Sequence, residues 1–164
     1  MGVVHEPVFR AMDEDPDDYR PASSWALAVD PDRRAQFGVI HERIAVGDRI
    51  PRHWHDVDEV VLYEAGIARV HLDGVDVDVA AGATVFIPAG AVHGTLNTGD
   101  RPVDVRAVFA TTRVRIDAVE RNAAPGTASA PPQATTYDFA AGTATVHGPT
   151  RLSSDDPPDM RPGG

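Results

Sequence analysis

Residues 47–66 read GDRIPRHWHDVDEVVLYEAG, and residues 82–97 read GATVFIPAGAVHGTLN. The first stretch places two histidines two positions apart and a glutamate soon afterwards, at His53, His55 and Glu59. Because alternate side chains of a strand share a face, His53 and His55 point the same way. Glu59 lies at an even offset from His53, so it returns to that face if the strand continues or turns tightly. The three side chains can therefore meet at one point.

The second stretch supplies a further histidine, His93, on a separate segment. Residues 83–87 are an apolar, strand-like run, and residues 88–90 read Pro-Ala-Gly, a turn signal. His93 reaches the first three residues only if a second strand lies beside the first. Imidazole nitrogens with one carboxylate oxygen suit a divalent first-row metal. A lone His-x-His is more often a pair of packing histidines, but the combined pattern predicts a metal site.

Both stretches resemble the two signature motifs of the cupin superfamily, position for position. The resemblance covers residues 47–97, including the intervening residues 67–81. It implies an all-β fold, a double-stranded β-helix or jelly-roll barrel with flexible N- and C-terminal arms. It also implies that the metal ligands, which face the barrel interior, are His53, His55, Glu59 and His93. The same fold serves dioxygenases, isomerases, cyclases, lyases, storage proteins and sensors, so it leaves the reaction open.

The rest of the chain shows the same β pattern. Short strand candidates separated by turn residues, without helical periodicity, are typical of a sandwich or barrel. Asp73-Gly74 predicts a two-residue hairpin turn. The expected strands span residues 25–29, 37–46, 59–64, 68–73, 75–79, 83–87, 92–97 and 103–114.

Changes in amino-acid composition divide the chain into three regions. Residues 1–22 are predicted to be an acidic N-terminal arm, either a solvated tail or an edge strand added to a partner subunit. Residues 23–120 are predicted to form the cupin barrel. Residues 121–164 are a Pro/Gly-rich C-terminal extension in which residues 137–146 either form one more strand or drape across the barrel. The end of this extension is predicted to be disordered.

Charge and composition exclude several functions. The chain has 164 residues, a net charge of −10 and no cysteine, so it lacks a disulfide and a thiolate zinc site. Its acidity argues against nucleic acid as a partner. All 15 basic residues are arginines, which excludes a Schiff-base lysine. No stretch has the length of a signal peptide or a membrane span, so a cytoplasmic protein is expected. By analogy with other small barrels, we expect a homodimer.

Three further residues are candidates for catalytic roles around the metal. Tyr63 lies four positions after Glu59, so it either faces a bound substrate or packs in the barrel wall. His41, on the preceding strand, either acts as a general base near neutral pH or is structural. Arg106 alternates with apolar neighbours and either binds a carboxylate or phosphate from inside the barrel or faces solvent.

The predicted function is a metal-dependent enzyme acting on a small organic molecule. Four protein ligands leave two positions on an octahedral ion, one for substrate and one for dioxygen or water. Iron(II) is the favoured metal and a dioxygenase the favoured enzyme, with manganese, nickel, zinc, cobalt and copper as alternative metals. The first alternative reaction is non-redox, with the metal as a Lewis acid in a cyclase, isomerase or lyase. The second alternative is a cupin that binds a small molecule without transforming it.

Overall fold

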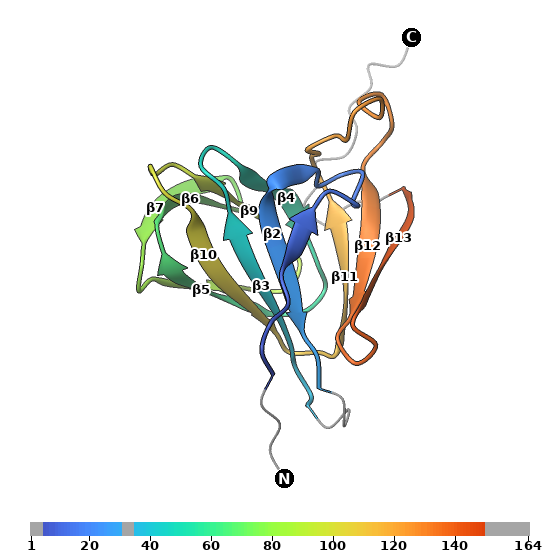
Figure 1. Cartoon of the computed structure of the whole chain (residues 1–164), viewed down its shortest axis with the longest axis horizontal. Helices are drawn as coiled ribbons and strands as arrows, with labels where there is room; N and C mark the ends of the chain where they lie inside the picture. The colour runs from blue at the N-terminus through green and yellow to red at the C-terminus, as the bar shows by residue number, and fades with distance from the viewer. Residues whose placement is uncertain (1–4, 31–34, 150–164) are drawn as a thin grey trace.

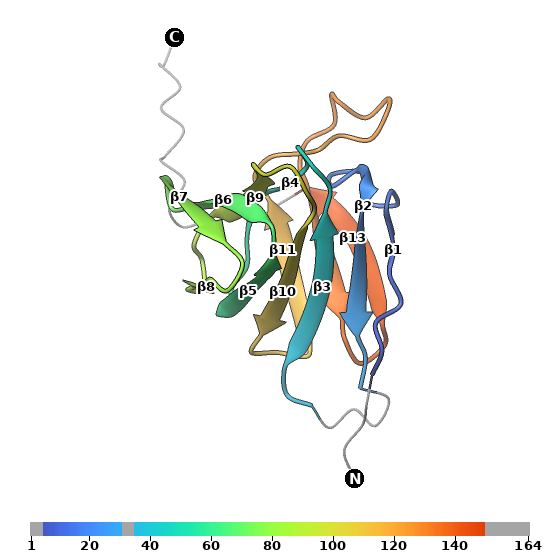
Figure 2. The same cartoon turned by 60° about the vertical axis from the view of Figure 1, so that its left-hand side comes forward.

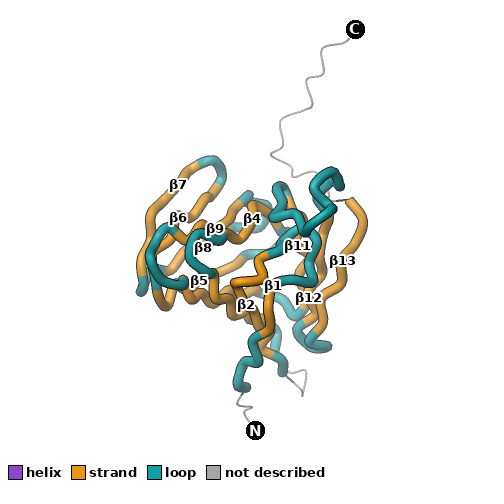
Figure 3. The backbone as a smooth tube through the Cα atoms, turned by 45° about the horizontal axis from the view of Figure 1, so that its top comes forward, coloured by secondary structure: helices purple, strands orange, loops and turns teal. Residues whose placement is uncertain are grey.

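The computed structural model describes residues 5–30 and 35–149 of the chain. In this part every regular element is a β-strand (Figure 3), and no helix is long and apolar enough to cross a membrane. The strands are β1 (Arg10–Met12), β2 (Arg20–Ala28), β3 (Gly38–Ile44), β4 (Arg49–Trp54), β5 (Glu59–Ala65), β6 (Ile67–Leu72), β7 (Val75–Ala80), β8 (Thr84–Ile87), β9 (His93–Asn97), β10 (Val103–Phe109), β11 (Arg113–Ala118), β12 (Gln133–Asp138) and β13 (Thr143–Pro149).

The strands form two antiparallel sheets that face each other, as Figures 1 and 2 show. One sheet has the order β1-β2-β3-β10-β5-β8, and the other has the order β13-β12-β11-β4-β9-β6-β7. Consecutive strands repeatedly cross from one sheet to the other, as from β4 to β5 and from β9 to β10. This arrangement confirms the predicted all-β jelly roll.

Two groups of buried apolar side chains fill the space between the sheets. One lies toward β5, β6 and β10 and is centred on Ile44 and Val103, both fully buried. The other lies toward β2, β12 and the end of β10 and includes Phe109. On β3, β5 and β10 of the first sheet, inward side chains largely alternate with outward ones, as a sheet with one covered face requires. On β10 the buried residues are Val103, Val105 and Phe109.

Turns connect the strands where the sequence predicts them. Asp73 and Gly74 both have positive φ and join β6 to β7 in a tight hairpin, which confirms the predicted turn. Gly90 also has a positive φ, and its N–H donates a hydrogen bond to the carbonyl of His55 over 2.7 Å. The turn after β8 is thereby tied to the end of β4. The predicted strand at 103–114 is divided in two, because residues 110–112 turn the chain from β10 into the opposite sheet.

The two ends of the chain add strands to the barrel. Within the segment expected as an arm, β1 pairs with β2 of the same chain, and β2 already begins at Arg20. Asp17 is buried, whereas a solvated tail leaves such a residue exposed. Arg121 donates a hydrogen bond to its carboxylate and so compensates its charge. In the C-terminal extension β12 and β13 form a hairpin that pairs with β11. The expected disorder concerns residues outside the described part.

Candidate metal and substrate site

Three histidines meet between the two sheets. His53, near the end of β4, lies opposite His93, the first residue of β9, and His55 follows directly after β4. One ligand atom from each of the three rings lies within 4.8 Å of the others. Trp54, between the first two, is itself buried on the other side of the strand. The sequence prediction that these histidines share one point is therefore matched by the geometry.

A backbone carbonyl orients each of the three imidazole rings. Nδ1 of His53 lies 2.8 Å from the carbonyl oxygen of Pro51, and Nδ1 of His93 lies 2.9 Å from that of Ala91. Nδ1 of His55 lies 2.8 Å from the carbonyl of Val57. A carbonyl only accepts, so each Nδ1 carries a proton. In the neutral ring this leaves the lone pair on Nε2, the arrangement found in metal-ligating histidines.

Glu59 completes the group from the opposite sheet. The chain turns through residues 55–58, and Glu59 opens β5, so the tight turn, rather than a continuing strand, brings it back. Its Oε2 lies 3.1 Å from Nε2 of His55 and 3.0 Å from Nε2 of His93. Burial alone would raise the pKa of Glu59, but the two imidazoles hold that pKa well below its usual range.

These four side chains fit a divalent cation. Nε2 of His93 is buried and has no hydrogen-bond partner, although the Glu59 carboxylate is close to it. Burial, and then the neighbouring imidazoles of His93 and His55, lower the pKa of His53 to about 3, so its ring is neutral at pH 7. A neutral ring whose Nδ1 bonds a carbonyl presents the lone pair of its Nε2, and Nε2 of His55 and of His93 both lie beside the Glu59 carboxylate. A cation between them would satisfy every one of these acceptors.

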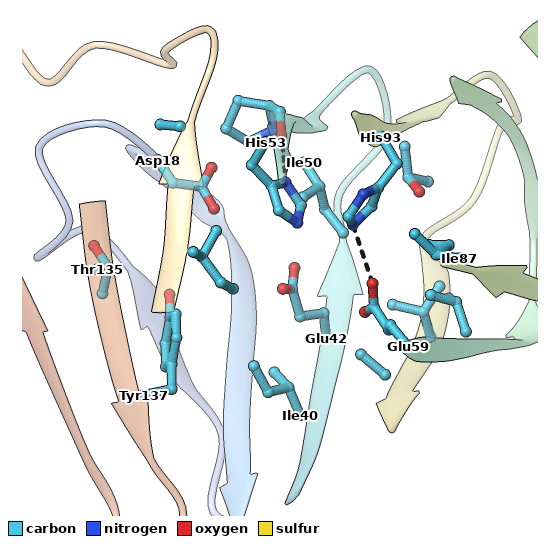
Figure 4. Close-up of a pocket in the computed structure, with 18 of the residues that line it drawn as sticks. Asp18, Ile40, Glu42, Ile50, His53, Glu59, Ile87, His93, Thr135 and Tyr137 are labelled. Atoms are coloured by element: carbon cyan, nitrogen blue, oxygen red, sulfur yellow. Dashed lines mark hydrogen bonds and ion pairs between the residues drawn. The ribbon is translucent and has the colours of Figure 1, made fainter. Parts of the chain in front are cut away.

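A cavity opens from this group toward β12. Its volume is about 80 Å³, several times the roughly 10–15 Å³ that one water molecule needs. His53, His93 and Glu59 line one end, as Figure 4 shows. Much of the wall between the ends is apolar and comes from Ile40, Ile50, Val61, Val70, Ile87, Val105, Ala107, Phe109 and Ile116.

Glu42 stands in this apolar wall, and the sequence reasoning missed it. Its side chain is 14 % exposed and lines the cavity from β3. In the view of Figure 4 it lies between the histidines and the group of Asp18 and Tyr137. Arg20 donates to the Glu42 carboxylate over 2.9 Å and to both oxygens of Asp18 over 2.6 Å. Burial raises the pKa of Glu42, although Arg20 opposes the effect. A carboxyl in this position can serve as a general acid or base toward a molecule in the cavity.

Tyr137 on β12 lies at the end of the cavity away from the histidines. It is 8 % exposed, and its ring packs edge-on against Trp25 at 5.6 Å. Burial, and then the carboxylates of Asp15, Asp18 and Glu42, raise the pKa of Tyr137 well above its usual value. The residue falls in the segment expected as an extension, so no motif pointed to it. The alternation of Thr135, Tyr137 and Phe139 on one strand is the signal that could have found it.

The predicted catalytic residue Tyr63 lies in the core rather than in the cavity wall. It is buried among the apolar residues around Ile44, and its hydroxyl bonds Oγ1 of Thr95 at 2.7 Å. Burial raises the pKa of Tyr63 to about 12, despite that hydrogen bond. The prediction left open whether this tyrosine faces substrate or packs in the wall, and the geometry matches packing.

His41 and Arg106 do not line the cavity and face outward, the second of the two alternatives left open for each. They lie opposite each other on β3 and β10, on the sheet face away from the cavity. Arg106 is 41 % exposed and pairs with Glu64 at 2.9 Å. Partial burial and the nearby Arg106 lower the pKa of His41. The residues next to them in sequence line the cavity instead, because successive side chains of a strand point to opposite faces.

Comparison with known proteins supports the same assignment. Residues 40–109 match the family model of the cupin domain. A crystal structure described as a sugar phosphate isomerase from a cupin superfamily, from Silicibacter pomeroyi, has a TM-score of 0.62 at 22 % identity. The match covers 91 % of this chain and 94 % of that one.

Two further crystal structures share the fold. A cupin-2 domain from Rhodospirillum rubrum has a TM-score of 0.56 at 14 % identity, covering 71 % of this chain and 72 % of that one. A polyketide cyclase from Streptomyces resistomycificus has a TM-score of 0.54 at 20 % identity, covering 66 % of this chain and 78 % of that one. Fold and site define a jelly-roll protein with a group of histidines suited to a metal. With the matched family model, residues 40–109 of the chain form a cupin domain.

Proposed function

We propose that this chain is a metal-dependent enzyme that acts on a small organic molecule held between the histidines and the wall formed by β3 and β12. The observation that carries the proposal is the convergence of three Nδ1-anchored imidazoles beside Glu59. These residues would hold the ion, and the cavity beside them has room for a substrate. A structural role alone would not require a cavity next to the ligands.

The reaction class that the site supports best is non-redox, with proton transfer by Glu42. When bound, a divalent metal would supply a Lewis acid that polarises a substrate oxygen. Glu42 faces the same cavity, and burial raises its pKa toward the range useful for a general acid or base. Arg20 fixes one carboxylate oxygen and leaves the other for substrate. An isomerase or a cyclase needs these parts, and two structures of similar fold carry those descriptions.

The second candidate is the iron(II) dioxygenase expected from the sequence. The four ligands leave two positions on an octahedral ion. The adjacent wall is apolar at Ile50, Ile87 and Val105, which suits dioxygen. In this reaction Glu42 would only orient the substrate.

Metal analysis of the purified protein tests the site. We expect close to one equivalent of a divalent metal per chain in the wild type and little in His53→Ala. His71→Ala is the matched control, because His71 pairs with Asp76 outside the histidine group. Equal metal content in the wild type and His53→Ala would contradict the proposal.

Anaerobic loading with iron(II), followed by nitric oxide, then separates the two reaction classes. A near-stoichiometric iron–nitrosyl signal, together with substrate-dependent oxygen consumption, would favour the dioxygenase. A metal-dependent conversion without oxygen uptake, lost in Glu42→Gln, would favour proton transfer.

A further inference from the structure

The part of the cavity between the histidines and β12 contains two groups with unused hydrogen-bonding capacity. Oε2 of Glu42 accepts from Arg20, while its Oε1 has no hydrogen-bond partner among the described residues. The hydroxyl of Tyr137 likewise makes no hydrogen bond within residues 5–30 and 35–149, although the side chain is only 8 % exposed and lines the cavity. Both groups line the cavity with capacity that no described side chain uses, so a molecule in the cavity can bond to them.

The polar groups around this pair are already occupied. Asp18 accepts two hydrogen bonds from Arg20 and a third from Nδ2 of Asn122 at 3.2 Å. Thr135 donates its hydroxyl to Asp15 over 3.0 Å. Glu42 therefore keeps a free acceptor and Tyr137 a free donor, beside the side chain of Gln133, which also lines the cavity.

The charge around the pair disfavours an anion. Five carboxylates line the cavity, and no arginine lines it; the chain contains no lysine. Arg20, the cation nearest this end, is 2 % exposed and lies between Asp18 and Glu42. When these three groups are ionised they carry a net charge of −1, and the surrounding wall is too apolar to screen it well.

We propose that Glu42 and Tyr137 form a subsite for an uncharged, hydroxyl-bearing end of the substrate, and that this subsite rejects a carboxylate or phosphate. This inference rests on the proposed function: the histidine end would hold the metal-bound part of the molecule, and ionised Glu42 would accept a hydrogen bond from the hydroxyl with which it exchanges a proton. A hydroxyl group matches the pair, since it donates one hydrogen bond to Oε1 of Glu42 and accepts one from the hydroxyl of Tyr137. A carboxylate would accept from Tyr137 but would face the oxygen of Glu42 without a proton between them.

The chemistry of this subsite does not suit an enzyme that must bind a phosphate group at the same place. A phosphate-binding pocket needs arginine, lysine or several free backbone N–H groups. Here the nearest guanidinium is already bound by two carboxylates. The Silicibacter pomeroyi protein is described as a sugar phosphate isomerase, but the shared fold is no reason to expect phosphate binding at this end of the cavity.

Three catechols of matched shape test the proposal. Protein loaded anaerobically with cobalt(II) is titrated with 4-(2-hydroxyethyl)catechol, 4-ethylcatechol and 3,4-dihydroxyphenylacetate. The cobalt absorption spectrum reports coordination of the shared catechol ring, and calorimetry gives each Kd. We expect the hydroxyethyl probe to bind about tenfold more tightly than the ethyl probe, the effect of one hydrogen bond to a charged group. The acetate probe should bind at least tenfold more weakly than the ethyl probe.

Three variants locate the effect. Tyr137→Phe should reduce the preference for the hydroxyethyl over the ethyl probe roughly threefold, the effect of one neutral hydrogen bond, and Glu42→Gln should reduce it further and relax the rejection of the acetate probe. Tyr63→Phe is the matched control, because that hydroxyl bonds Thr95 in the core, and it should keep the wild-type ratios.

Equal or weaker binding of the hydroxyethyl probe by the wild type, including no binding, would overturn the subsite. A preference for the acetate probe, or wild-type ratios in Tyr137→Phe, would do the same. Failure to load cobalt would instead contradict the proposed function, and metal content is measured first for this reason.

Discussion

Replacing Arg20 with alanine should destabilise the protein strongly. The guanidinium is 2 % exposed, and it bonds both oxygens of Asp18 and one oxygen of Glu42. Its removal leaves two carboxylates facing each other in an apolar wall. Breaking a buried ion pair costs about 3–5 kcal/mol. Since roughly 2–4 °C of Tm is lost per kcal/mol in a chain of this size, we expect a fall of about 10 °C.

Arg43→Ala is the matched control for this prediction. Arg43 lies on the strand beside β2 and pairs with Asp104 over 2.7 Å, but the side chains are 58 % and 31 % exposed. Exposed ion pairs contribute about 0–1 kcal/mol. The control should therefore lose no more than about 3 °C. The comparison separates the loss of a buried cation from the loss of any arginine.

The effect of Arg20→Ala should also depend on pH in a defined direction. Burial raises the pKa of Glu42, and Arg20 opposes that rise. Without Arg20 the pKa of Glu42 rises further above its unfolded value, so ionisation penalises the folded state more as pH increases. Thermal unfolding followed by circular dichroism should show a larger deficit at pH 7 than at pH 5. A deficit equal to that of Arg43→Ala, or one that does not shrink at pH 5, would refute this reasoning.

The remaining predictions concern the metal ligands, acid stability and assembly. Glu59→Gln should lower metal affinity roughly 10–100-fold or more while the circular dichroism spectrum stays that of the wild type, because the amide keeps the shape of the side chain and loses its charge; metal content after dialysis measures this. The metal-free protein should lose stability as pH falls from about 6.5 toward 3, because the folded-state pKa of His53 is lowered to about 3 and the unfolded chain binds its proton first; urea unfolding at pH 7 and pH 5 checks the sign. The homodimer stays a prediction, and sedimentation velocity should give twice the chain mass.

The sequence predicted the histidine group well because its geometry is local. His53 and His55 are two positions apart, and the turn that returns Glu59 is only four residues long. His93 required one long-range assumption, a neighbouring strand, and β9 supplies it directly opposite His53. The orientation of the rings could not be read in this way. Each ring depends on a backbone carbonyl two residues away, and residue identity does not determine where a carbonyl points.

The inward side of β3 illustrates what the sequence left open. His41 and Glu42 are adjacent, so the register of β3 decides which of the two side chains faces the cavity. His41 is a candidate on chemical grounds because histidine ordinarily titrates near neutral pH, with a structural role as the alternative, and Ile40 and Ile44 flank it at odd offsets. Those two isoleucines are buried, and alternation from them places Glu42, not His41, on the inner face. Here the apolar pattern carried more information than the chemistry of a single side chain.

The residues that line the cavity also explain why the two histidine-containing motifs predict metal binding better than they predict the substrate. The matched family segment, residues 40–109, contains all four proposed ligands and Glu42. Arg20, which holds Glu42 in place, and Tyr137, which completes the proposed subsite, both lie outside that segment. The acidic stretch that composition assigns to solvent becomes cavity wall because Arg121, 104 positions later, neutralises Asp17 and bonds nearby carbonyls. Counting charges within a short stretch of sequence cannot identify a partner as distant as Arg121. Substrate preference should therefore follow the two terminal segments, while metal binding follows the central one.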